Sequence, residues 1–170
     1  MHNDTEKFQR QYLPLHPKLY RIAFVLTGNS QDAEDILQDA YCKLWNRRTE
    51  LEKVQNPEAF CVTMVKNLCY DMLRSPKRAP KGQPHDTAQS PDGCPEAAIA
   101  AGDAENLIRE LIDRLPPNQR QVLQLRGLGG CSIEEIEEIT GLSAVNIRVL
   151  LSRARKLIRE QYDKLTDHGQ

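Results

Sequence analysis

Apolar residues recur three and four positions apart along almost the whole chain, which is the spacing of one face of a helix. No stretch alternates apolar and polar residues convincingly, as a half-buried strand does. The clearest stripe lies within residues 33–45. A second stripe includes Phe60, Met64, Val65, Leu68, Met72 and Leu73. The pattern predicts helices over residues 5–27 with a break near Pro14 and Pro17, 30–48, 57–74, 103–115, 117–128, 132–140 and 143–162.

Residues that favour helix ends stand at these predicted boundaries. Short polar side chains accept hydrogen bonds from the free N–H groups of a first helical turn. Such residues are expected as N-caps at Ser30, Asn56, Ser132 and Ser143. Pro57 suits the first helical position, Glu135 completes a capping box with Ser132, and Gly141 can adopt a left-handed turn. Residues 132–162 therefore read as two helices joined by a tight turn, a helix-turn-helix.

The composition changes between residues 75 and 101, where Pro, Gly, Ser and charged residues replace large apolar ones. Such a composition is typical of a flexible linker and marks a domain boundary. We therefore predict an all-α protein of two small helical domains joined by a flexible linker. The first domain covers residues 5–78, the linker 79–102, and the second domain, which holds the helix-turn-helix, 103–165.

Composition excludes several classes of protein. No apolar run approaches the roughly 20 residues of a membrane span, and the N-terminus lacks an apolar signal core, so neither membrane insertion nor secretion is expected. The cysteines are odd in number and form no Cys-x-x-Cys pair, so we expect reduced thiols that pack as small hydrophobes, with a zinc or redox site as the alternative. We expect no metal and no cofactor. The cysteines are Cys42, Cys61, Cys69, Cys94 and Cys131.

The formal net charge of −1 conceals a concentrated basic helix. Residues 148–159 hold five cations and no anion, whereas residues 134–138 hold four glutamates. In a helix-turn-helix the second helix enters the major groove, and its early residues reach base edges. The residues expected there are Asn146, Arg148, Val149, Ser152 and Arg153. Arg155, Lys156 and Arg159 suit phosphates, so the pattern favours DNA binding over a merely solvated helix.

The first domain carries DAEDILQDAYCKLW at residues 32–45 and AFCVTMVKNLCYDMLRSPKR at residues 59–78. These stretches resemble the region-two domain of sigma factors, most nearly the extracytoplasmic-function (ECF) group of the sigma-70 family. The second domain carries LPPNQRQVLQLRGLGGCSIEEIEEITGLSAVNIRVLLSRARKLIR at residues 115–159, which resembles region four of that family. The resemblance thus covers both helical halves in the same order.

The resemblance implies roles for residues of the first domain. Asp35 and Gln38 match positions that grip the clamp helices of the largest RNA polymerase subunit, with Asp39, Leu44 and Trp45 nearby. Asn67 matches a position that meets the non-template strand of the −10 element, and residues 46–55 correspond to the segment that pockets a flipped-out base. Further contacts to the −10 DNA are expected from Phe60, Thr63, Lys66, Arg74, Lys77 and Arg78.

For the second domain, the resemblance implies that the basic helix reads the −35 element. The residues concerned are Asn146, Arg148, Val149, Ser152, Arg153, Arg155 and Lys156. The protein is then expected to be a cytoplasmic, non-enzymatic factor that directs core polymerase to promoter DNA. The expected partners are the clamp helices and the flap of core polymerase, promoter DNA and, by family analogy, an anti-sigma factor.

Three departures from the family pattern stand out. Glu137 occupies a position where a helix-turn-helix prefers a small residue, Val149 and Leu150 replace Ser and Arg, and Phe60 replaces Trp. Two rival functions stay open. An autonomous helix-turn-helix regulator would bind DNA through the second domain in the same way. An enzyme could use the carboxylates of residues 32–39, although no histidine or nucleophile accompanies them.

Overall fold

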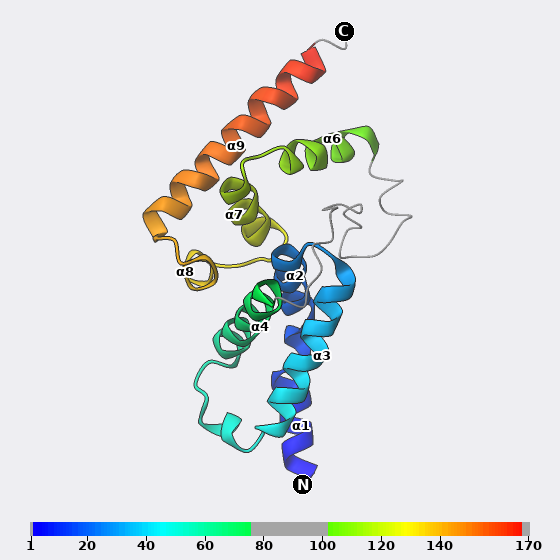
Figure 1. Cartoon of the computed structure of the whole chain (residues 1–170), viewed down its shortest axis with the longest axis vertical. Coiled ribbons are helices and arrows are strands. Elements are labelled where there is room, and N and C mark those ends of the chain that lie inside the picture. Colours follow the sequence, from blue (N-terminus) through cyan, green and yellow to red (C-terminus); the bar gives the residue numbers. More distant parts are fainter. Residues whose placement is uncertain (1, 76–101, 168–170) are drawn as a thin grey trace. The chain divides into compact units, whose positions relative to one another are not determined.

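The computed structural model of the chain describes residues 2–75 and 102–167. Every regular element among these residues is a helix, so the predicted all-α class is confirmed (Figure 1). The helices form two compact units, the first holding α1 to α4 and the second α6 to α9. No helix within the described ranges is long and apolar enough to cross a bilayer. The predicted linker, residues 79–102, lies outside the described residues except for its last one.

The first unit is built on three helices that contact one another, α2, α3 and α4 (Figure 1). Its core includes Leu19, Ile22, Ile36 and Val65, all nearly inaccessible to solvent. The predicted break near the two prolines is confirmed, because a 3-10 turn separates α1 from α2. The elements are α1 (His2–Gln11), η1 (Leu13–Leu15), α2 (His16–Thr27), α3 (Ser30–Asn46), η2 (Glu50–Lys53) and α4 (Pro57–Arg74).

The predicted N-cap of α3 is wrong by one residue. Gly28 ends α2 with a left-handed φ of 82°, which places Asn29 in an extended conformation before the first helical residue. Asn29 Oδ1 therefore accepts the hydrogen bond from Asp32 N at 2.7 Å, and Ser30 is already helical. At α4 the prediction is confirmed, since Asn56 Oδ1 accepts from Ala59 N at 3.1 Å.

The predicted apolar face of α4 is only partly buried. The buried residues of this helix are Cys61, Val62, Val65 and Cys69, whereas Phe60, Met64 and Leu68 are half-exposed. Compact side chains on the buried face allow α4 to pack closely on α2 and α3.

Three of the thiols pack as small hydrophobes, as predicted. Cys61, Cys69 and Cys131 are buried, and burial raises the pKa of Cys61 and of Cys69 to about 12. Cys42 is exposed, contrary to the prediction, because it lies on the solvent side of α3. Cys94 lies outside the described residues.

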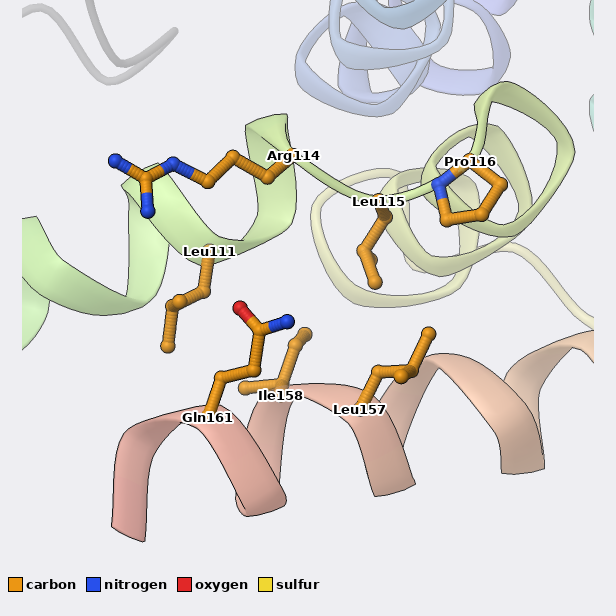
Figure 2. Close-up of a pocket in the computed structure, with 7 residues that line it drawn as sticks. All are labelled: Leu111, Arg114, Leu115, Pro116, Leu157, Ile158 and Gln161. Atoms are coloured by element: carbon orange, nitrogen blue, oxygen red, sulfur yellow. The ribbon is translucent and has the colours of Figure 1, made fainter. Parts of the chain in front are cut away.

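The second unit is assembled along its last helix, which α6, α7 and α8 all contact. Leu111 and Leu115 point toward Leu157 and Ile158 of that helix, around a small hollow of about 30 Å³ (Figure 2). The last helix runs five residues beyond the predicted end at residue 162, because no Gly or Pro interrupts it. The elements are α6 (Gly102–Asp113), α7 (Pro117–Gly127), α8 (Ile133–Thr140) and α9 (Ala144–Asp167).

The helix-turn-helix forms from α8 and α9 as predicted. Ser132 and Glu135 make the reciprocal capping box, with N···O distances of 3.0 and 3.1 Å. Gly141 ends α8 with a φ of 77°, a left-handed conformation that side chains with a Cβ adopt at a cost. Ile136 of α8 and Ile147 of α9 are fully buried, which fixes the second helix against the first.

Candidate nucleic-acid interface

A groove of about 530 Å³ lies on the first unit between the end of α3 and one stripe of α4. The α4 stripe repeats every three or four residues, which places its members on one helix face. It includes Phe60, Met64 and Leu68 of the predicted apolar face. The α4 residues that line the groove are Phe60, Thr63, Met64, Asn67, Leu68 and Asp71, and they face Lys43, Asn46 and Arg47.

The chemistry of this first groove is mixed. Phe60, Met64 and Leu68 supply an apolar floor, and the side chains of Thr63 and Asn67 can hydrogen-bond to a base edge. Two cations line the rim with a single carboxylate. Aromatic and apolar floors that accept a stacked base, with cations for the backbone, are typical of sites for single-stranded nucleic acid.

The structure gathers three of the residues predicted to contact the −10 DNA, namely Phe60, Thr63 and Asn67. Lys66 is half-buried on α4 and does not line the groove. Arg74 lies one turn beyond it, where Arg74 Nη2 is 3.3 Å from Asp71 Oδ1, both side chains being exposed. Lys77 and Arg78 lie outside the described residues.

Sequence reasoning missed four lining residues, Lys43, Met64, Leu68 and Asp71, and it covered Arg47 only as part of the segment 46–55. The two cations come from the C-terminal end of α3, where basic residues favour the helix dipole and so carry no separate signal of binding. Lys43 Nζ lies 3.5 Å from Asp39 Oδ2 on the same helix. Met64 and Leu68 have apolar spacing that a core residue shares, so only the fold distinguishes the two roles.

The outer face of α3 presents the residues predicted to bind polymerase. Asp35, Gln38 and Asp39 are exposed side by side on the face opposite the core. Leu44 differs from the prediction, because it is 1% exposed and lies in the core of the unit. Trp45 is 37% exposed, and the Arg48 guanidinium carbon lies 4.5 Å from its ring centroid. Asp35, Gln38 and Asp39 thus form a polar surface on a rigid helix.

A second groove, of about 660 Å³, lies on the second unit along α9. The predicted residues Arg148, Ser152, Arg155 and Lys156 line it together, three to four residues apart on the helix. Asn146, Val149 and Arg153 are exposed on α9 but do not line this groove. Arg159, also expected to suit a phosphate, lines it as well, and the remaining lining residues are Arg126 of α7, Ile133 of α8 and Leu151 of α9.

The second groove is strongly basic. Five cations line it, and no carboxylate is among the described residues that do so. Sequence reasoning missed Arg126, which comes from α7 and joins the basic helix only through the fold. Arg126 Nη1 donates to Cys131 O at 2.8 Å, which fixes the side chain beside α9. Several Arg and Lys side chains in a concave track suit the phosphates of a nucleic acid backbone.

Within residues 2–75 and 102–167, no three His, Cys, Asp or Glu side chains gather closely enough to hold a metal ion.

Known proteins resemble the chain over both units. The family model described as Sigma-70 region 2 matches residues 12–79, and that described as Sigma-70, region 4 matches residues 105–158. RNA polymerase sigma factor SigV of Bacillus subtilis is 31% identical over 148 residues, covering 85% of this chain and 84% of SigV. ECF RNA polymerase sigma factor SigJ of Mycobacterium tuberculosis is 30% identical over 158 residues, 89% of this chain.

Some of these relatives are longer proteins. The chain spans half of SigJ and 36% of the probable sigma factor RfaY of Xanthomonas campestris. Among solved structures, the sigma factor RpoE of Bartonella quintana has the same fold, with a TM-score of 0.61 and 24% identity over 91% of this chain and 96% of that one. The matches to both regions and to SigV establish that the chain belongs to the sigma-70 family of RNA polymerase sigma factors, in its extracytoplasmic-function group.

Proposed function

We propose that the protein is an alternative sigma factor, which binds core RNA polymerase and directs transcription initiation at promoters that carry its −10 and −35 elements. The observation that carries the proposal is the pair of chemically different grooves, one on each unit. The protein performs no reaction of its own, and it acts in the cytoplasm, where the polymerase meets the chromosome. The proposal includes the domain boundaries, with the first domain ending at residue 78 and the second beginning at residue 103.

The polar face of α3 serves as the contact to the clamp helices of the polymerase. Asp35 and Asp39 offer carboxylates and Gln38 an amide to basic and polar partner side chains, on a helix whose opposite face is core. Trp45, partly exposed at the end of the same helix, adds apolar area of the kind that dominates binding energy at interfaces. The flap of the polymerase is the proposed contact of the second unit.

The first groove takes the melted non-template strand of the −10 element. A base turned out of the duplex stacks on the apolar floor around Phe60, while the amide of Asn67 hydrogen-bonds to its edge. The second groove takes a phosphate backbone of the −35 duplex. Asn146, Val149 and Arg153, exposed beside that groove, then reach base edges in the major groove.

An anti-sigma factor is a further proposed partner. The RpoE structure of Bartonella quintana is a complex with the anti-sigma factor NepR, and the structure of CnrH, which has the same fold with a TM-score of 0.56, is a complex with the cytosolic domain of CnrY. By analogy, a protein of this class holds the factor inactive until a signal releases it.

Run-off transcription from a promoter library tests the proposal. Core polymerase is assayed alone, with the protein, and with an Asp35→Arg/Gln38→Ala variant. We expect start sites that require the protein and disappear with the variant. The matched control is Glu6→Arg/Gln9→Ala, an exposed carboxylate and amide with the same spacing on α1. Tight operator binding by the protein alone, without initiation by core polymerase, would instead establish an autonomous regulator.

A further inference from the structure

Helix α1 is attached to the first unit through one apolar side chain. Phe8 is the single apolar residue in its sequence, HNDTEKFQRQ. The Phe8 ring stacks on Tyr12 with centroids 5.3 Å apart, and it meets Trp45 edge-on at 5.3 Å. An isolated helix of ten residues is barely stable in water, so the helical state of α1 depends on this docking.

The loop between α3 and α4, residues 47–55, holds as regular structure only the short 3-10 helix η2. Leu51, 6% exposed, is its one buried residue. Its described backbone hydrogen bonds are local, such as Leu51 N to Arg47 O and Val54 N to Leu51 O, both at 3.1 Å. The conformation of such a loop is set by what its side chains contact.

Those contacts come from α1. A small cavity of about 20 Å³ is lined on one side by α1 and Tyr12 and on the other by Arg48, Leu51 and Glu52 of the loop. Lys7 Nζ lies 3.6 Å from Glu52 Oε1 across this junction. Arg48 covers the face of Trp45 and donates Nη1 to its carbonyl oxygen at 3.0 Å, so Phe8 and Arg48 both hold the same indole.

We propose that α1 is a brace that sets the conformation of the loop 47–55 and, through it, the base selectivity of the first groove. Phe8 and Lys7 are the positioning residues, and neither lines the groove. The start of the loop does line it, through Arg47 and the preceding Asn46. Displacing α1 therefore shifts the groove residues Asn46 and Arg47, although Phe8 and Lys7 do not themselves line the groove. The brace lies ahead of residues 12–79, the part matched as region 2. Its effect on promoters rests on the proposed function.

The structural half of this proposal can be tested without polymerase or DNA. Phe8→Ala should release α1, speed hydrogen exchange at the amides of residues 47–55 roughly tenfold, and move the fluorescence of Trp45, the single tryptophan, to longer wavelength. The matched control is Phe24→Ala, which removes a half-exposed ring of α2 that stacks on Tyr20. Faster exchange in α1 with unchanged exchange in the loop overturns the brace.

A charge exchange keeps the proposal testable even where Phe8→Ala impairs folding. Lys7→Glu places two carboxylates at the junction, and we expect loop exchange to rise about twofold, as suits an exposed ion pair. Combining it with Glu52→Lys restores the attraction in reverse and should return the loop to its original exchange rate. A double variant no better than Lys7→Glu alone overturns the positioning role of Lys7.

The functional half uses core polymerase and promoter pairs that differ at one −10 base. Phe8→Ala should reduce the preference for the cognate base about threefold or more, while the affinity for core polymerase stays unchanged. An unchanged preference overturns the link to base selection. Failure of the unaltered protein to support initiation overturns the proposed function instead, and the exchange measurements still decide whether α1 braces the loop.

Discussion

The two grooves are of similar size, about 530 and 660 Å³, yet their linings differ sharply. The first has an apolar floor, one amide side chain from α4, two cations and a carboxylate. The second has five cations and, among the described lining residues, no carboxylate. Bases buried on apolar side chains and phosphates held by cations are different modes of recognition, which depend differently on salt.

The two linings assign base discrimination and general affinity for nucleic acid to different grooves. In the first groove, Phe60 and Asn67 can discriminate one base from another but offer little long-range attraction. In the second, cations attract any nucleic acid backbone, and under the proposed function the base sequence is read by neighbouring residues such as Arg153. The division suits a protein that melts DNA at one site and anchors on a duplex at the other.

The largest effect is expected when the second unit alone is destabilised. Ile147 is fully buried between α9 and the rest of the helix-turn-helix, so Ile147→Ala should cost about 2–5 kcal/mol of the second unit's free energy of unfolding. Hydrogen exchange measures each unit separately, and we expect faster exchange in α7, α8 and α9 with α2, α3 and α4 unaffected. Val149→Ala, at a position 38% exposed on the same helix, serves as the control.

The next largest effect is expected in the first groove. Asn67→Ala removes the amide that faces the groove, so discrimination at one −10 position should fall by about 1–3 kcal/mol. Binding of a single-stranded −10 oligonucleotide by the polymerase complex, compared with oligonucleotides substituted at each base, measures it. The control is Asn106→Ala, which replaces an exposed asparagine of α6 and should leave the discrimination between oligonucleotides unchanged. Equal loss for all oligonucleotides would mean that Asn67 supports affinity without reading a base.

A smaller effect is expected in the second groove, on the salt dependence of DNA binding. Arg155→Ala removes one cation, so the slope of log affinity for −35 duplex against log salt should decrease by about one. The loss of affinity should be similar for every duplex sequence, because phosphates carry no base identity. Arg114→Ala, an exposed cation outside the groove, is the control, and an equal change of slope there would contradict a specific phosphate track.

The helical architecture could be predicted because its signals are local. The boundaries around Asn56, Ser132 and Gly141 depend on a few neighbouring residues, and each is found as expected. The cap of α3 was misplaced because Asn29 and Ser30 can both accept the hydrogen bond. The left-handed Gly28 decides between them by setting where the chain enters the helix.

The site could be predicted only where residues share one helix. Thr63 and Asn67 meet on α4 by their spacing alone, whereas Arg126 reaches the basic groove from another helix. The sequence could not assign the apolar stripe around Met64 to the core or to a groove floor, because both demand the same side chains. The two differ in what packs opposite, which depends on the placement of α3 relative to α4.

The smallest effect concerns the core of the first unit and is expected at alkaline pH. Burial is the main cause that raises the pKa of the Cys61 thiol, with the nearby Glu58 carboxylate adding to it, from 9.0 to about 12. The folded first unit therefore keeps protons that its unfolded chain releases above pH 9.0. Its free energy of unfolding should be undiminished below that pH and decline as the pH rises toward about 12.

Urea denaturation of the first unit at increasing pH measures this decline. Cys69 contributes in the same direction through burial alone, and so does Tyr41, whose pKa burial raises to about 12. A Cys61→Ala/Cys69→Ala variant should start less stable but lose less stability with rising pH, because its core no longer excludes a thiolate. Cys42→Ala should follow the unaltered protein, since that thiol is exposed. A variant that keeps the full pH dependence would assign the decline to tyrosines and lysines instead.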